Sequence, residues 1–214
     1  METGICRLCG QRKDIVDSHV WPKFAYKRYA SDLNKGGAFL DLSKKKLTNA
    51  QYTAYWFCEE CDNETLSAGE THAGQLCAAL DAQPTVARAY DHRLLAFVTS
   101  ISWRSAMHHV VSGGVRDEGR LREAMRHWQQ YLLGRKSRVE PFTQHLLVVY
   151  PTDFDTHKAL GGQVFLDKHL LLSQIGPLLI VGLLGHKQLS VAPPHRTVTR
   201  ARQYQCRGRS ELRR

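Results

Sequence analysis

Two Cys-x-x-Cys pairs constrain this chain more than any other feature. Cys6 and Cys9 lie near the start of the sequence, and Cys58 and Cys61 follow after 48 intervening residues. Two such pairs offer four thiolates, the tetrahedral set that a structural zinc ion takes. The two-residue gap lets a tight turn direct both sulfurs at one ion, and Gly10 supplies the conformational freedom that such turns often need. The spacing predicts a zinc module with a long insertion between its two halves.

A redox-active pair, with the other pair accidental, is the alternative interpretation. A thioredoxin-like site favours a βαβ context, which the sequence lacks. The first residues do not have the pattern of a secretory signal, and the longest apolar stretch, 170–185, is too short and interrupted to span a membrane. We therefore expect a cytoplasmic protein without a membrane partner, whose paired cysteines bind metal. Cys77 and Cys206 have no evident partner.

The hydrophobic pattern predicts an α+β fold in two parts, a zinc module at 1–75 and a helical, then β-rich body at 76–214. Amphipathic periodicity and Gly or Pro boundaries indicate helices at 71–83, 85–111 and 117–134. Short apolar runs indicate a small antiparallel sheet with strands at 144–151, 162–172 and 177–185. The basic segment 196–214 fits a disordered arm or a final basic strand.

The charge balance favours an anionic partner. Thirty Lys and Arg residues against twenty Asp and Glu residues give a formal net charge of +10. Nucleic acid is the commonest partner of such a chain, and simple solubility is the alternative. The cations expected to contact phosphates are Lys23, Lys27, Arg28, Lys44, Lys45 and Lys46. The aromatic residues interleaved with the first three can stack on bases, although core packing of a helix after Pro22 is preferred.

Two segments of the chain resemble a family. They are DSHVWPKFAYK (17–27) and FCEECDNETLSAGE (57–70), and they are similar to a bacterial branch of the HNH endonuclease family with sequences of the type SHIIPKF…LCxxCE. The resemblance covers residues 6–70 and implies a ββα-metal hairpin held by zinc knuckles. In that family the histidine of this turn is the general base that activates water to attack a phosphodiester, and His19 occupies its place. The unperturbed pKa of histidine, near 6.5, suits that role. A structural role, capping the hairpin, is the alternative for His19.

The resemblance also implies ligands for a catalytic Mg²⁺ or Mn²⁺ ion, and here the chain departs from the family. Ser18 stands where Asp or His is usual, and a hydroxyl is a poorer ligand than a carboxylate. Asp62 takes the place of the second ligand and suits a hard cation, or it acts as a first-turn acid of a helix.

Two further acids are tentative members of this site. Along a regular strand the side chain of Asp17 would lie on the same face as His19, with Ser18 on the opposite face. A bulge that shifts the strand by one residue would bring Asp17 into the site. Glu70 returns to the side of Asp62 on a helix, where it either binds metal or pairs with a cation such as Arg104.

The sequence therefore leads to an HNH-like endonuclease that hydrolyses DNA, with bacterial or phage defence implied by the resemblance. The alternative is a catalytically degenerate zinc protein that binds nucleic acid or a protein partner without cleavage. A third, weaker interpretation is a subunit of a larger complex or homo-oligomer, with 141–214 as the assembly surface.

Overall fold

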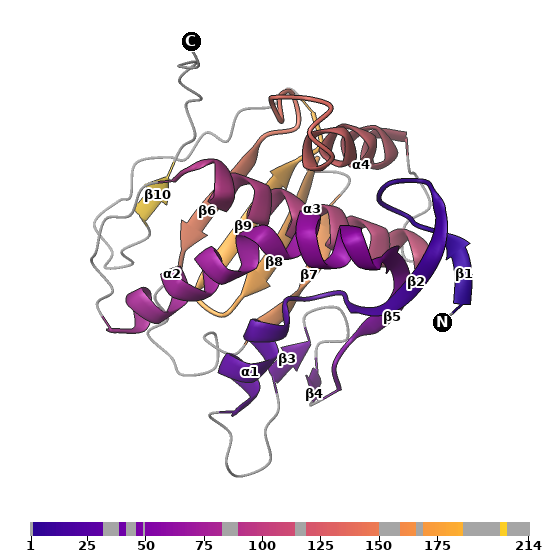
Figure 1. Ribbon diagram of the computed structural model, residues 1–214. Helices are drawn as coiled ribbons and strands as arrows, with labels where there is room; N and C mark the ends of the chain where they lie inside the picture. Colours follow the sequence, from indigo (N-terminus) through magenta and orange to yellow (C-terminus); the bar gives the residue numbers. More distant parts are fainter. Residues whose placement is uncertain are drawn as a thin grey trace, which may run out of the picture.

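The computed structural model (Figure 1) describes residues 2–31, 39–41, 46–48, 50–82, 90–113, 119–149, 159–165, 169–185 and 202–204. Within these ranges two sheets and four α-helices form a mixed α+β fold, as predicted. None of the described helices is both long and apolar enough to cross a membrane.

The first sheet, in the order β1-β2-β5, carries both cysteine pairs. β1 (Glu2–Ile5) and β5 (Thr53–Cys58) each pair antiparallel with β2 (Arg12–His19). The register of β2 against β5 shifts between Val16 and Asp17, which marks a β-bulge. Ile15 is buried, so a regular strand would also bury Asp17; the bulge instead exposes Asp17 and buries Ser18.

α1 (Lys23–Ser31) follows β2 directly after Pro22, which is pre-organised for the start of a helix. Trp21, Tyr26 and Tyr29 are all buried. The preferred core role of these aromatic residues is therefore confirmed, and base stacking by them is not supported.

The second sheet has seven strands in the order β10-β6-β9-β8-β7-β3-β4. Its strands are β3 (Phe39–Asp41), β4 (Lys46–Thr48), β6 (Gln144–Val148), β7 (Ala159–Phe165), β8 (Leu170–Ile175), β9 (Leu178–Leu183) and β10 (Arg202–Tyr204). All pairs are antiparallel except β3 with β7. The sheet is larger than expected because three short strands join it from distant segments.

One predicted strand is wrong. The run 162–172 is divided between β7 and β8, which pair antiparallel with Phe165 opposite Leu170. His169 has a positive φ of 53° immediately before β8. The polar residues 167–169 separate the two apolar runs, and they mark the reversal that the prediction of one strand overlooked.

The helical segments begin at the second cysteine pair. A π-helical turn, η1 (Cys61–Leu66), and a 3₁₀ turn, η2 (Ser67–Gly69), lead into α2 (Glu70–Ala82); α3 (His92–Val111) and α4 (Gly119–Leu132) follow. α2 and α4 agree with prediction. α3 starts later than the predicted helix at 85–111, because the Asp91 carboxylate caps it by accepting from the backbone N–H groups of Arg93 (3.1 Å) and Leu94 (2.9 Å). Residues 85–89 lie outside the described ranges.

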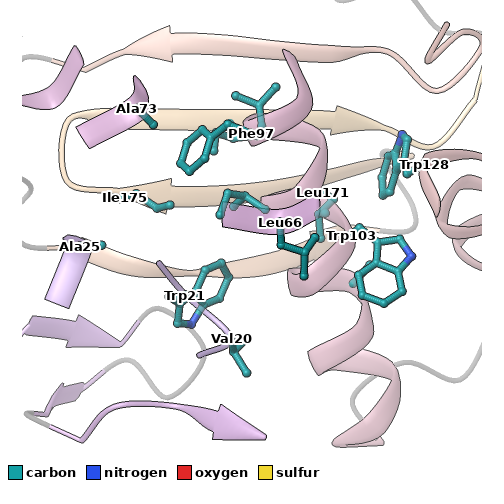
Figure 2. Close-up of a cluster of buried hydrophobic side chains, with 14 of the residues drawn as sticks. Val20, Trp21, Ala25, Leu66, Ala73, Phe97, Trp103, Trp128, Leu171 and Ile175 are labelled. Atoms are coloured by element: carbon teal, nitrogen blue, oxygen red, sulfur yellow. The ribbon is translucent and has the colours of Figure 1, made fainter. Parts of the chain in front are cut away.

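α3 is the central helix of the core. It packs against β6 to β9 of the second sheet and also contacts α2, η1 and η2. Figure 2 shows the buried side chains that join these layers, from Val20 and Trp21 through Phe97 to Leu171 and Ile175. The same hydrophobic core therefore contains residues from both sides of position 75; the division into two domains there stays a prediction.

Gly69 permits a close approach of η2 to α3. A Cβ at this position would lie 2.7 Å from Phe97 Cβ and 2.9 Å from the Arg93 carbonyl oxygen. We expect Gly69→Ala to lower the free energy of unfolding by about 1–3 kcal/mol, because the backbone must move to relieve the clash. Gly74→Ala is the control, since its Cβ would meet Phe24 at 3.6 Å and the helix would gain up to about 1 kcal/mol of propensity. Equal stabilities of the two variants in urea unfolding would contradict this packing.

Candidate functional site

The four cysteines of the two pairs come together. The ligand atoms of Cys6, Cys9, Cys58 and Cys61 all lie within 4.8 Å of one another, and the Cys9 and Cys58 sulfurs are 4.0 Å apart. Four sulfurs bound tetrahedrally at about 2.3 Å from zinc are separated by about 3.8 Å. The cluster can hold a metal ion, and its all-thiol chemistry is consistent with a structural zinc.

Backbone hydrogen bonds shape the first half of the cluster. Gly10 N–H donates to the Cys6 carbonyl (2.8 Å), and Cys6 N–H donates to the Gln11 carbonyl (2.9 Å). Gly10 has a φ of +76°, which explains why glycine closes this turn. Arg7 N–H then donates to the Trp56 carbonyl (2.8 Å), which ties the turn to β5 and so to the second pair.

The pKa values of three of these thiols are shifted by burial and by neighbouring groups. Burial raises the pKa of Cys6, but hydrogen bonds with neighbouring backbone groups outweigh it and lower that pKa to about 7. Burial raises the pKa of both Cys58 and Cys61, and neighbouring thiols add to the effect at Cys61. Because zinc binds thiolates, filling this cluster releases protons, and its affinity for zinc is expected to rise with pH.

A second group of polar side chains gathers where β2 ends and η1 begins. His19, at the end of β2, is partly buried, and its Nε2 lies 2.7 Å from the Gln51 side-chain oxygen. An amide oxygen only accepts, so Nε2 carries the hydrogen and the lone pair of the neutral ring is on Nδ1. The ring also lies beside Tyr26, with the centroids 5.8 Å apart.

Asp62 and Ser18 meet in this group. Burial raises the pKa of Asp62, which the Ser18 hydroxyl opposes by hydrogen bonding to the carboxylate. The charge of Glu70 raises the same pKa further, whereas the charges of Arg104 and His19 lower it. The structure therefore brings the segment of Ser18 and His19 together with Asp62 and Glu70, although His19 and Asp62 are 43 positions apart in the sequence.

Arg104, from α3, is the cation at the centre of this polar group. Only 2% of its side chain is exposed, and its Nη2 donates to Glu70 Oε1 (2.9 Å) and the Ser100 hydroxyl (3.2 Å). Its Nη1 donates to the backbone carbonyl of His19 at 3.4 Å. Glu70 thus pairs with Arg104, one of the two alternatives expected for it.

Other predicted site residues lie apart from this group. Asp17 is exposed and stands opposite Tyr55 in the register of β2 and β5. Lys23 and Lys27 are exposed on α1, and Arg28 pairs with Asp81 through its Nε (2.9 Å). Lys46 begins β4, while Lys44 and Lys45 fall outside the described residues.

Two contacts of His19 were not predicted from the sequence. Gln51 orients the His19 ring, yet a glutamine just before a strand carries no distinguishing signal. The bond from Arg104 to the His19 carbonyl joins residues 85 positions apart, which no local pattern predicts. Among the described residues, the four cysteines form the single group of three or more His, Cys, Asp or Glu ligands gathered this closely.

The chain matches no protein-family model, no curated protein and no solved structure. The function is therefore inferred from the geometry of these two clusters.

Proposed function

We propose that this protein is a zinc-stabilised, divalent-metal-dependent endonuclease that hydrolyses DNA phosphodiester bonds, with His19 as general base. The observation that carries the proposal is that His19 follows Ser18 at the end of β2, and the Ser18 hydroxyl hydrogen-bonds the partly buried carboxylate of Asp62. Asp62 directly follows Cys61, a member of the four-cysteine cluster. A base and a metal-binding acid held by one rigid module are the minimal parts of such a site.

The contact with Gln51 leaves the lone pair of a neutral His19 ring on Nδ1, which is what a general base needs. Gln51 accepts the hydrogen of Nε2, so Nδ1 takes the proton of the attacking water. The water oxygen then forms a bond to phosphorus while the bond from phosphorus to the leaving oxygen breaks, and the leaving oxygen keeps the electron pair and takes a proton from solvent water. Arg104 holds the backbone of His19 through its carbonyl and restricts movement of the base relative to Asp62.

Asp62 is the residue that fits a divalent ion. Mg²⁺ is commonly held by one or two carboxylates, with waters and substrate phosphate completing its shell, so a single good carboxylate is compatible with it. Ser18 contributes a hydrogen bond to Asp62 in this arrangement. When bound, the ion supplies positive charge to the scissile phosphate and the leaving oxygen.

We expect His19→Ala to slow cleavage of supercoiled plasmid by about 10²- to 10⁴-fold in the presence of Mg²⁺ or Mn²⁺, because a general base contributes about that much. The affinity for DNA should stay within about twofold of the wild type in anisotropy titrations, since the imidazole acts on water. Asp62→Asn should lose cleavage as well, and higher Mn²⁺ should restore part of it.

His92→Ala is the matched control, because His92 is exposed at the start of α3 and belongs to neither cluster. Its cleavage rate should equal that of the wild type. If His19→Ala and His92→Ala nick plasmid equally fast, the proposal for His19 is wrong.

The second candidate is the same scaffold without catalysis, binding nucleic acid or a protein. Arg104 favours it, because a buried guanidinium already supplies positive charge to Glu70 and Asp62, where a divalent ion would otherwise be needed. Ser18 also favours the non-catalytic candidate, because a hydroxyl is a poorer ligand for a divalent ion than the carboxylate expected at this position. Binding of DNA without divalent-dependent nicking would select this candidate.

A further inference from the structure

α4 and the turn after it carry a dense set of exposed cations. These are Arg120, Arg122, Arg126, Arg135, Lys136 and Arg138, hereafter the α4 ridge. The acids between 119 and 140 are Glu123 and Glu140. Such an excess of positive charge creates a strong local potential for anions.

The α4 ridge is held rigidly. The opposite face of α4 is buried, and Trp128 Nε1 donates to the Phe142 carbonyl at 2.8 Å. After the helix, Gly134 takes a φ of +67°, and the N–H groups of Arg135 and Lys136 both donate to the Gln130 carbonyl. The cations after α4 are therefore fixed relative to those on it.

The ridge is also joined to the zinc cluster. Gln129 Nε2 donates to the carbonyls of Leu8 (2.5 Å) and Arg7 (3.2 Å), which lie in the turn between the first two cysteines. Arg7 is itself exposed and extends the basic face. In Figure 1, α4 lies next to the loop that leads into β2.

We infer that the α4 ridge is the docking surface for the sugar–phosphate backbone of duplex DNA. Arginine provides five of its six cations, and its planar guanidinium matches phosphate oxygens in a bidentate way. Among the described residues, Arg126, Arg135 and Arg138 form no ion pair with a carboxylate. Their charge is therefore not neutralised by the ion pairs within this part of the protein.

Two features favour a duplex over other polyanions. A helix that binds a lipid surface also exposes large apolar residues, but Leu121, Met125 and Trp128 of α4 are buried. A platform for single strands exposes aromatic rings for base stacking, whereas His127, Trp128 and Tyr131 are at least partly buried. The surface thus offers contacts to the backbone alone. The inference shares only the nucleic-acid partner with the proposed function and does not require cleavage.

The test is a titration of a labelled 20-base-pair duplex with the full-length, zinc-loaded protein, without added Mg²⁺, at several salt concentrations. The ridge variant carries Arg126→Gln, Arg135→Gln and Arg138→Gln. The control variant removes the same number of cations elsewhere on the surface, with Arg12→Gln, Lys13→Gln and Arg93→Gln.

We expect the ridge variant to bind at least about tenfold more weakly and to reduce the salt slope by about one for each lost contact, with little change in the control. An equal loss of affinity for the duplex in the two variants, or a loss of affinity in the control variant alone, would overturn the assignment of the α4 ridge. Binding of anionic vesicles but not of duplex would also overturn it. Binding through the ridge with no nicking in a parallel assay would support the ridge and refute the nuclease proposal, so the two failures are distinguishable.

Discussion

Cys58→Ser is expected to unfold the N-terminal sheet and to abolish stoichiometric zinc binding. Structural zinc sites contribute apparent binding free energies on the order of 10 kcal/mol at neutral pH, comparable with the whole stability of a typical domain. The cluster joins β5 and η1 to the turn that contacts α4, so its loss removes a link between these segments. Far-UV circular dichroism, thermal unfolding and native mass spectrometry measure the effect.

Cys77→Ala is the matched control for this experiment. Cys77 is buried in α2 and lies outside the four-cysteine group, so its replacement should retain the ion and lose no more than about 2 kcal/mol. A Cys58→Ser protein that keeps one zinc per chain and the unfolding midpoint of the wild type would contradict a structural metal site.

Arg104→Met is the second substitution with a large expected effect. It should lower the free energy of unfolding by about 3–5 kcal/mol, because removal of one partner leaves Glu70 and Asp62 without their nearby cation in a largely buried setting. Urea unfolding of the wild type and the variant gives the difference directly. Under the proposed function, the variant should also lose cleavage, since the His19 carbonyl loses its donor.

Two comparison variants separate the charge effect from a loss of packing. Arg104→Met combined with Glu70→Gln should recover part of the stability, because the unpaired carboxylate is removed. Lys13→Met breaks the pair with Glu60, which is solvent-exposed, and should leave the unfolding midpoint unchanged. A single Arg104→Met variant as stable as Lys13→Met would show that the buried pair does not hold α2 to α3.

Local patterns made parts of this site predictable from the sequence. The two-residue gaps between cysteines determine tight turns, so the four sulfurs were expected to converge and they do. Arg104 was expected to pair with a buried acid such as Glu70, because a cation within an apolar helix needs a partner.

The other features of the site depend on contacts between segments that are distant in the sequence. Whether Asp17 or Ser18 faces Asp62 depends on a bulge in β2, and that bulge is set by pairing with β5, a strand more than 30 residues away. Gln51 reaches His19 from the segment before β5, which sequence periodicity does not describe. The contact of α4 with the turn between the first two cysteines was not predictable either, because Gln129 and Leu8 are 121 positions apart in the sequence.

The central claim is that the strand pair β2–β5 and the adjoining η1, held by zinc, present His19 and Asp62 to a phosphodiester. The most direct test measures nicking of supercoiled plasmid by the zinc-loaded wild-type protein, with and without Mg²⁺ or Mn²⁺, under conditions in which DNA binding is verified in parallel. We predict that nicks accumulate only when the divalent ion is added, and that they disappear in His19→Ala while binding persists. Plasmid that is bound but remains supercoiled at every metal concentration would contradict the claim.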